Sequence, residues 1–255
     1  MSSGLRAAIA YSLPSYRLGF CGPQEAKSKK ILLDFAAGKK VEEEQVKEVF
    51  RHFEAPYPYF KLIAKSNGIA DPFDKRVVKA MWVGNKLLDS VKTDDLRDLI
   101  RTDFVKPSLL SREEAEKRAR RIPDGVVPHH SFHVLILGAV SHTVELKGTM
   151  LDLCRVGWGR VKKVTPARIA SQSDAGGSNK LQVTSKSLVL GKKIRLGVEL
   201  EREISWNKDI IPKVKTGDWV SFHWAQACEV LTPQEVQDLE HYTQKTIDMV
   251  SEQSR

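Results

Sequence analysis

Residues 216–231 read Thr-Gly-Asp-Trp-Val-Ser-Phe-His-Trp-Ala-Gln-Ala-Cys-Glu-Val-Leu, and they carry the clearest structural signal in the second half of the chain. Gly217-Asp218 is typical of a turn, and the side chains from Trp219 onward alternate with the period of a strand. This alternation predicts one buried strand, with aromatic residues on both faces. One face carries Val220, Phe222 and Trp224, and the other carries Trp219, Ser221 and His223.

A helix is predicted directly after this strand. Thr232 can cap it, and Pro233 takes the first helical position, where a missing N–H has no consequence. Glu235 completes a capping box with Thr232. The sequence therefore predicts that a capped helix closes the chain.

Several short strands are predicted upstream of this stretch, separated by turn residues. They cover residues 150–154, 159–164, 181–184, 187–190, 194–200 and 203–206. This spacing indicates a small barrel, with Cys154 on its first strand. Residues 171–179, rich in serine and glycine, are predicted to form a flexible loop.

The first half of the chain shows helical periodicity instead. Helices are predicted from Gly4 to a stop at Pro14, from Pro23 to Gly38, from Val41 to Phe53, and from Asp71 through Gly84 to Val91. The prediction is an α+β protein. Residues 1–145 form a helical domain, and residues 146–255 form a small OB-like β-barrel with a C-terminal helix.

Composition narrows the class of protein. The net charge of +9 is divided as +5 over residues 1–145 and +4 over residues 146–255, so no basic tail marks a nucleic-acid site. No apolar run reaches the roughly 18–20 residues of a membrane span, and the N-terminus lacks the features of a signal peptide. Three scattered cysteines suit a reducing compartment. These features predict a cytoplasmic protein without a membrane partner.

Two segments of the second half carry a family resemblance. Cys154, Gly159 and Val161 fit a Cys-x-x-x-Pro-Gly-x-Val pattern, and residues 217–227 fit Gly-Asp-[Tyr/Trp]-Val-x-x-His-x-Gly-Phe-Ala. Over residues 146–255 the chain resembles the HypC/HupF hydrogenase-maturation chaperones. Trp158 stands at the proline position, Ala225-Gln226 replaces Gly-Phe, and Cys154 is internal, whereas the family cysteine begins the mature chain.

The resemblance implies a function for this half. It implies an accessory chaperone of hydrogenase maturation, rather than an enzyme, that handles a metal fragment or the large-subunit precursor. Cys154 and His223 match the residues that carry the iron fragment in that family. The implied partner is a hydrogenase large subunit or an iron-fragment scaffold protein, contacted through Cys154, Trp158 and Trp224. Residues 16–23, 82–85 and 128–133 make the first half similar to an uncharacterised prokaryotic family found near hydrogenase genes.

The residues themselves indicate two groups of metal ligands. A thiolate and an imidazole, such as those of Cys154 and His223, can hold iron or another transition metal transiently. His129, His130 and His133 form the second group, because helical spacing would bring pairs of them onto one face. The alternative for both groups is ordinary packing of buried side chains.

Cys21 is a further candidate, as a reactive thiol in a glycine-flanked loop where Arg17 could lower its pKa. An inert buried thiol is the alternative. Two other functions stay open. The barrel could bind nucleic acid through its tryptophans, or the histidine group could serve a metalloenzyme.

Overall fold

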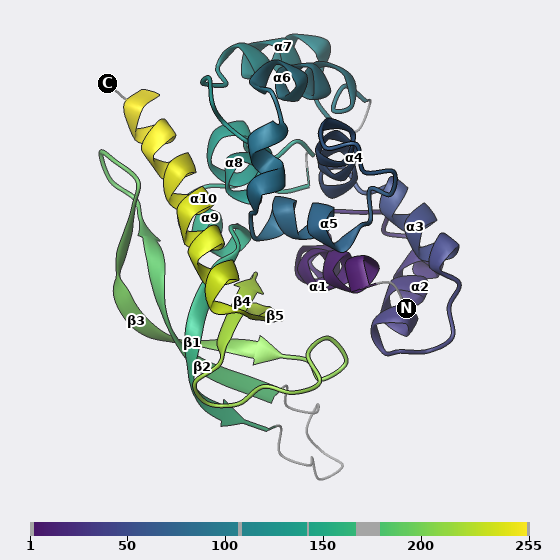
Figure 1. Ribbon diagram of the computed structural model, residues 1–255, viewed down its shortest axis with the longest axis vertical. Helices are drawn as coiled ribbons and strands as arrows, with labels where there is room; N and C mark the ends of the chain where they lie inside the picture. Colours follow the sequence, from purple (N-terminus) through teal and green to yellow (C-terminus); the bar gives the residue numbers. More distant parts are fainter. Residues whose placement is uncertain (1–2, 107–108, 142, 167–178, 254–255) are drawn as a thin grey trace.

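The computed structural model describes residues 3–106, 109–141, 143–166 and 179–253, and it confirms the predicted α+β class. Helices form the first part of the chain, a five-stranded barrel follows, and a long helix ends it (Figure 1). The predicted loop 171–179 lies outside the described residues except for Asn179. In the described part of the chain, no helix is both long enough and apolar enough to cross a bilayer.

Short helical segments precede the barrel. They are α1 (Ser3–Arg17), α2 (Ala26–Ala36), α3 (Glu43–Arg51), α4 (Pro56–Ser66), α5 (Lys75–Trp82), η1 (Lys86–Ser90), α6 (Thr93–Thr102), α7 (Arg112–Arg120), α8 (His130–Phe132), η2 (His133–Leu137) and α9 (Thr149–Cys154). The strands are β1 (Gly157–Thr165), β2 (Asn179–Val189), β3 (Arg195–Trp206), β4 (Trp219–His223) and β5 (Gln226–Leu231), and the last helix is α10 (Pro233–Gln253).

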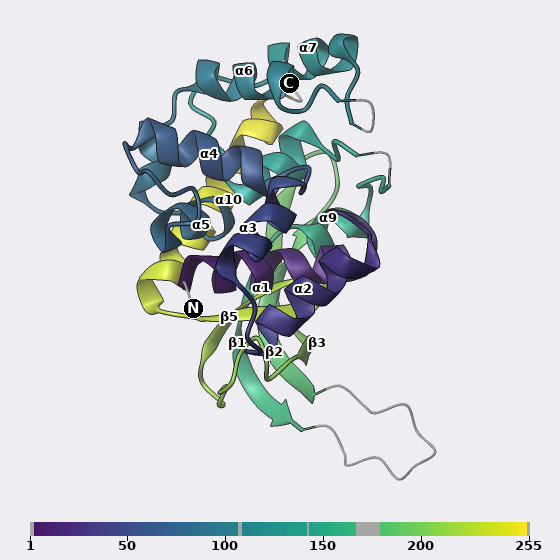
Figure 2. The same ribbon diagram turned by 90° about the vertical axis from the view of Figure 1, so that its right-hand side faces the viewer.

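The barrel closes in the order β1-β2-β3-β5-β4, with β4 paired antiparallel to β1. Only the short contact between β3 and β5 is parallel among the described strands. Val220 and Phe222 of β4 point into the barrel core, as their alternation predicts. The opposite face of β4, with Ser221 and His223, turns toward α1. α1 packs against β4 and β5, and Figure 2 shows it directly above β5.

The stretch from Trp219 to Leu231 is a hairpin rather than one strand. β4 ends at His223, β5 begins at Gln226, and Trp224 and Ala225 lie between them with φ of 50° and 56°. Left-handed values at both central residues match a type I′ turn, which normally takes asparagine and glycine. The prediction of a single strand is wrong because neither tryptophan nor alanine is typical of such a turn.

Residues 149–154 form a helix where a strand was expected. A short apolar run fits a buried helix as well as a strand, so periodicity alone cannot separate the two. Gly148, with φ of 53°, precedes α9 and redirects the chain before the helix begins. Cys154 therefore ends a helix just before the barrel and does not lie on the first strand.

Two helix ends also differ from the prediction. α1 continues past Pro14 to Arg17, although Pro14 has no N–H to donate to the carbonyl of Ala10. The long helix expected around Gly84 ends instead at Trp82. Gly84 has φ of 98°, and a Cβ there would lie 2.2 Å from the ring of Tyr242. Only a residue without a Cβ fits at Gly84, because Tyr242 of α10 packs directly against the turn after α5.

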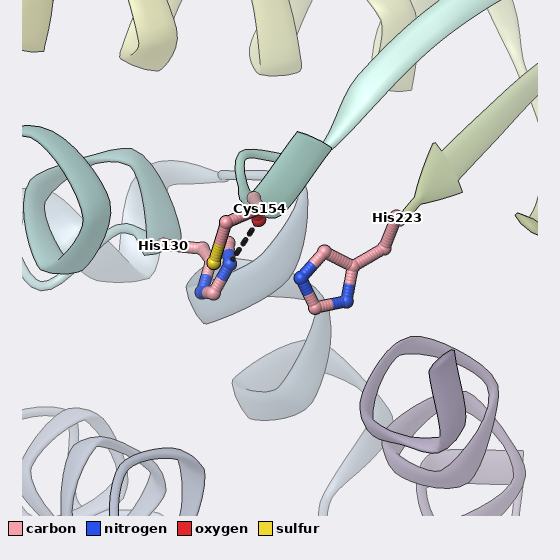
Figure 3. Close-up of side chains that lie close together, drawn as sticks. All are labelled: His130, Cys154 and His223. Atoms are coloured by element: carbon pink, nitrogen blue, oxygen red, sulfur yellow. Dashed lines mark hydrogen bonds between the residues drawn. The ribbon is translucent and has the colours of Figure 1, made fainter. Parts of the chain in front are cut away.

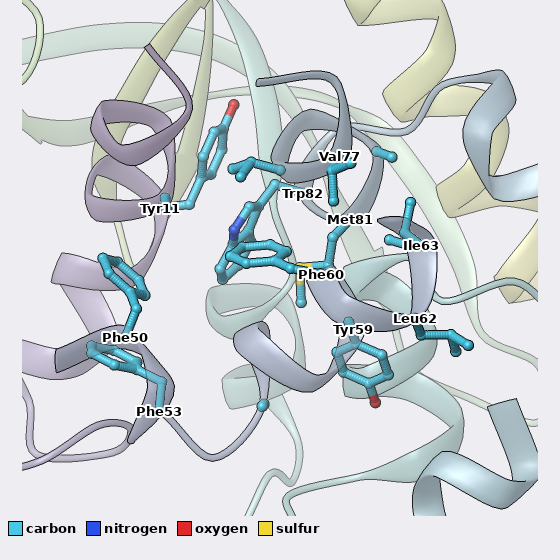
Figure 4. Close-up of a cluster of buried hydrophobic side chains, with 14 of the residues drawn as sticks. Tyr11, Phe50, Phe53, Tyr59, Phe60, Leu62, Ile63, Val77, Met81 and Trp82 are labelled. Carbon is cyan, nitrogen blue, oxygen red and sulfur yellow. The ribbon is translucent and has the colours of Figure 1, made fainter. Parts of the chain in front are cut away.

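Buried apolar side chains run without a break from the helices to the outer side of the barrel. Tyr11 of α1 stacks on Trp82 of α5, with ring centroids 5.4 Å apart, inside the large cluster of Figure 4. The same cluster includes Trp158 of β1, Leu231 of β5 and Tyr242 of α10. The division at residues 145/146 stays a prediction, but the site described below lies where these elements meet.

Candidate metal centre

Three side chains that are distant in the sequence meet where the helices join the barrel. His130 begins α8, Cys154 ends α9 and His223 ends β4 (Figure 3). One ligand atom from each, a ring nitrogen or the Sγ, lies within 4.8 Å of the others. The three residues are 4 %, 8 % and 1 % exposed, respectively. This group, the candidate centre, could hold a metal ion.

The hairpin turn fixes two of these residues relative to each other. The backbone N–H of Trp224, just after His223, donates to the carbonyl of Leu153, just before Cys154, at 2.8 Å. Trp224 holds this position with a left-handed backbone, which is unfavourable for a residue with a Cβ. Such strained residues concentrate at functional sites, where the surrounding structure maintains them.

A backbone carbonyl sets the tautomer of His223. Its Nδ1 lies 2.7 Å from the carbonyl oxygen of Tyr11, in the turn of α1 that precedes Pro14. A carbonyl oxygen can only accept, so Nδ1 carries the proton and Nε2 keeps a lone pair. Nε2 makes no hydrogen bond of normal geometry with any described residue, although the backbone of Cys154 interacts with this imidazole and raises its pKa. Nε2 faces Cys154 and His130 in Figure 3.

His130 is held in the same manner with its nitrogens exchanged. Its Nε2 donates to the carbonyl of Cys154 at 2.8 Å, so Nδ1 keeps the lone pair. Nδ1 also lacks a hydrogen-bond partner within the described part of the chain. Trp82 packs against both imidazoles, with ring centroids 4.4 Å from His130 and 5.5 Å from His223. Metal-binding histidines in proteins commonly donate their other N–H to a carbonyl in this way.

Burial keeps the candidate centre uncharged. It lowers the pKa of His223 to about 4 and that of His130 well below its ordinary value. Burial also raises the pKa of the Cys154 thiol to about 12. At neutral pH the centre therefore presents two neutral imidazoles and a protonated thiol. A bound cation would displace the thiol proton, because the thiolate is the form that ligates metal.

A cavity of about 60 Å³ lies beside the three residues. Each water needs roughly 10–15 Å³ on this measure, so the space accepts an ion with small ligands. Trp82 and Trp224 form part of its wall, and Cys21 and Glu54 form another part. The indole nitrogens of Trp82 and Trp224 are buried without a hydrogen bond to any residue that the structure describes. The cavity lining thus includes both the side chains that could ligate a metal ion and two tryptophans whose N–H groups have no partner among the described residues. Burial, and then the negative charge of Glu54, raise the pKa of the Cys21 thiol, opposite to the lowering expected from Arg17.

Comparison with known families gives one match. Residues 1–255, the whole chain, match a family of unknown function, DUF6390. The chain belongs to this family. No curated protein and no solved structure matches it.

The other predicted ligands of this DUF6390 protein have different surroundings. His129 caps α8, with its Nδ1 accepting from the N–H of Ser131 at 3.3 Å. The Nδ1 of His133 lies 3.1 Å from the hydroxyl of Tyr59. Both are buried, but neither is part of the candidate centre. Sequence reasoning pairs Cys154 with His223 but assigns His130 to a separate group, since only the fold brings α8 to the end of β4.

The two tryptophans predicted to contact a partner also differ. Trp158 is 6 % exposed, with the guanidinium of Arg155 5.5 Å from its ring. Trp224 is half-buried, and its ring centroid lies 4.8 Å from that of Phe20. Trp224 thus lies at the cavity wall, while Trp158 packs inside. Whether a partner contacts either residue stays a prediction.

The DUF6390 chain has a second buried polar group that its sequence did not indicate. The ammonium of Lys79, 5 % exposed, lies 2.5 Å from Glu229 and 2.8 Å from Glu235. The hydroxyl of Tyr11 lies 2.8 Å from that of Ser221 and donates to Glu229 at 3.2 Å. We call these five residues the ion-pair cluster. It ties α1 and α5 to the hairpin and to the start of α10, and so positions the Tyr11 carbonyl against His223.

Proposed function

We propose that this protein binds a transition-metal ion through His130, Cys154 and His223 and carries it, alone or within a small metal fragment, as an assembly accessory protein. One observation carries the proposal. Two buried imidazoles each donate one N–H to a backbone carbonyl and keep a second nitrogen without a hydrogen bond of normal geometry to any described residue. A ring nitrogen of each imidazole lies within 4.8 Å of the Cys154 Sγ.

Energetics favour a ligand here over ordinary packing. A buried polar atom without a hydrogen bond costs about 1–3 kcal/mol, and such atoms are rare in native proteins. Nine buried side-chain polar atoms of the described residues lack a hydrogen bond, and two of them, Nδ1 of His130 and Nε2 of His223, belong to the candidate centre, which also holds the Cys154 thiol. Coordination would satisfy both with one ion. Imidazole and thiolate together select iron, nickel, copper or zinc rather than magnesium or calcium.

The geometry suits holding an ion rather than exchanging it freely with solvent. In a tetrahedral site with bonds of about 2.0–2.3 Å, neighbouring donor atoms lie about 3.4–3.6 Å apart, so the group would contract slightly around the ion. Three protein donors leave a fourth position for a ligand that the cavity can accommodate. The indole N–H groups of Trp82 and Trp224 suit acceptor atoms on such a ligand.

The sequence resemblance supplies the partner of this proposal. The Cys154 segment and the Gly217–Ala227 segment are the two parts that resemble the HypC/HupF chaperones, and their strands pair directly, with Gly157 opposite Phe222. This pairing supports a common role for Cys154 and His223. We therefore propose a hydrogenase large subunit or an iron-fragment scaffold protein as the partner.

Metal titration tests the site itself. Anaerobic addition of Co²⁺ to the metal-free protein should give one bound ion per chain, with the near-ultraviolet absorption of a cobalt–thiolate bond. Cys154→Ser should remove this absorption and weaken binding at least about 100-fold, because even changes behind the ligands cost about 10–100-fold.

Two matched substitutions test the histidines. His223→Asn keeps an amide N–H in place of Nδ1, and His130→Gln keeps one in place of Nε2, so each preserves its hydrogen bond to a carbonyl while removing the free nitrogen. Both should weaken Co²⁺ binding, whereas Cys228→Ser, in β5 and outside the cavity lining, should not. Unchanged binding in all three ligand variants would refute the site.

Affinity purification from the native cell tests the partner. A hydrogenase large subunit or scaffold protein should copurify with the wild-type chain together with stoichiometric metal, and less should copurify with Cys154→Ala. Copurification of nucleic acid in a salt-sensitive manner would instead favour the barrel as a nucleic-acid-binding module.

A further inference from the structure

β3 has an open edge along residues 199–203. β2 pairs with one side of this stretch, whereas β5 meets the other side of β3 only at Ser205. Between residues 199 and 203, no backbone hydrogen bond leaves this second side for any residue that the structure describes. β3 lies at the left margin of the molecule in Figure 1. A free strand edge presents a row of N–H and C=O groups to which another extended chain can bond.

The alternation of the backbone shows which residues face this edge. Ser205 donates its N–H to the carbonyl of Ala225, on the side away from β2. Every second residue of a strand directs its backbone groups to the same side, so Glu199, Glu201 and Glu203 direct theirs there too. The pairing of β3 with β2 keeps its register over this range, so the alternation is unbroken. The N–H and C=O groups of the three glutamates are therefore available to a further strand.

The outer edge of β2, on the other side of the same ribbon, is covered. Arg155 donates to the carbonyl of Lys186 at 2.6 Å, and the carboxylate of Asp152 accepts from the N–H of Leu188 at 2.8 Å. Asp152 also accepts from Arg202 at 3.2 Å, which connects the ribbon to α9. Proteins commonly cover strand edges, because an open edge pairs with other chains. The fold thus closes one edge of the ribbon and leaves the edge of β3 to a partner.

The glutamates along the open edge define the charge of the segment that fits it. Glu199, Glu201 and Glu203 are exposed and share one face of β3. Among the described residues only Glu203 of the three has a cationic partner, Lys180 at 3.1 Å, while Glu201 accepts from the amide of Gln182. Opposite charges that face each other on neighbouring strands attract. An added strand therefore needs lysine or arginine at every second position.

The other face of the same edge is apolar. Val198 and Leu200 are 74 % and 57 % exposed, more than any other large hydrophobic side chain that the structure describes. Apolar residues between the cations of an added strand would cover them. A second copy of this chain does not fit, because pairing two such edges would set glutamate opposite glutamate.

We propose that the open edge of β3 binds an extended segment of a partner protein in which basic residues alternate with apolar ones. The segment bonds to the backbone of the three glutamates and covers Val198 and Leu200. This docking surface goes beyond the proposed metal binding and requires no ion, so it holds or fails separately. Arg202 connects the ribbon to α9, so the docked segment is held by the same part of the fold that presents Cys154.

A synthetic peptide tests the edge on the full-length protein. The probe alternates lysine and valine over about nine residues and has blocked ends, and the control peptide has the same composition with its lysines grouped together. In fluorescence anisotropy the alternating peptide should bind about tenfold more tightly than the control. Its binding should slow amide hydrogen exchange at Glu199, Glu201 and Glu203 but not at Leu200 and Arg202, which already face β2. Equal binding of the two peptides, or no binding, would overturn the docking edge.

Two variants separate backbone pairing from charge. Glu201→Pro removes an N–H that points away from β2, so the barrel keeps its own ladder while affinity for the alternating peptide should fall about tenfold. Glu199→Lys combined with Glu201→Lys should transfer the preference to a peptide that alternates glutamate and valine. Glu42→Lys combined with Glu113→Lys makes the same change in net charge at exposed residues of the helical part and is the control. Unchanged affinity in Glu201→Pro would overturn strand addition, and an unchanged preference in the first lysine pair would overturn recognition of a basic segment.

Discussion

The ion-pair cluster and the candidate centre lie in the same interface between helices and barrel, yet they are built differently. In the ion-pair cluster the buried Lys79 ammonium and the Tyr11 hydroxyl both have partners. In the candidate centre each imidazole keeps one nitrogen without a hydrogen bond to any described residue. Tyr11 takes part in both, with its hydroxyl in one and its carbonyl bonded to His223. The same interface thus gives the polar atoms of one group hydrogen-bond partners and leaves two nitrogen atoms of the other without them, in a group that could hold a metal ion.

Acid should act first on the buried imidazoles, and this is the largest effect we expect. Burial lowers the pKa of His129 to about 3 and that of His133 to about 4. The unfolded chain, with histidine pKa near 6.5, binds protons first, so stability present at pH 7 is lost as pH falls below about 6.5. Between pH 7 and pH 5 each of these two groups should remove about 2 kcal/mol from the free energy of unfolding.

Urea denaturation of the metal-free protein over this pH range measures the loss. His129→Asn keeps an acceptor for the cap of α8 but does not titrate, so its pH dependence should be shallower than that of the wild type. The ion-pair cluster should respond later. Burial raises the pKa of Glu235, but the bonds of its carboxylate to Lys79 and Thr232 lower the pKa by more, so that it lies below its ordinary value. The stability that Glu235 contributes should therefore persist until pH falls below about 4. An equal pH dependence in His129→Asn would contradict this assignment.

Breaking the ion-pair cluster should have the next largest effect. Lys79→Met leaves Glu229 and Glu235 without their buried cation, and removing one partner of a buried pair costs about 3–5 kcal/mol. Both carboxylates are 26 % exposed, so we expect a loss near the lower end of that range. Lys61→Met is the control, because its 2.8 Å pair with Asp103 is half exposed and such pairs contribute less than about 1 kcal/mol. Equal losses would show that the cluster contributes no more than a surface pair.

A bound ion should stabilise the candidate centre by a comparable amount. At a free Co²⁺ concentration 100 times the dissociation constant, linkage predicts about 2.7 kcal/mol of added stability. Cys154→Ser should lose this gain, whereas Lys79→Met should retain it despite its lower starting stability. Parallel denaturation curves with and without Co²⁺ measure both. A gain of equal size in Cys154→Ser would place the ion elsewhere.

Local signals in the sequence were sufficient for much of the fold. The alternation in β4 and the capping box of α10 predicted those elements, and the structure shows Thr232 and Glu235 bonded reciprocally, at 2.9 and 3.3 Å. Expectations failed where a contact distant in sequence decides the conformation. Gly84 ends α5 beneath the ring of Tyr242, and the turn after His223 depends on a hydrogen bond to Leu153.

For the candidate site too, local sequence signals identified the residues, but contacts between segments distant in sequence decide how they are grouped. Donor chemistry singled out Cys154, His223 and His130, because few side chains can ligate a soft metal. Their grouping could not be predicted, since it requires α8, α9 and β4 to converge. The Lys79 ion pairs were missed for a further reason. A lysine within an amphipathic helix looks like a solvated residue until the partner element is known.

The smallest expected effect tests the strained hairpin that carries His223. Alanine is strained in the left-handed conformation of residue 225, and Ala225→Gly should relieve this strain and add about 1 kcal/mol to the free energy of unfolding. Glycine also gives the unfolded chain more conformational freedom, which should subtract about 0.4–1 kcal/mol from the free energy of unfolding. Stability should therefore rise slightly or stay unchanged. Ala227→Gly, at a fully buried position in β5, gains nothing and should lose about 1 kcal/mol. Equal losses in urea denaturation would mean that the turn stores no strain, and that packing alone aims His223 at Cys154.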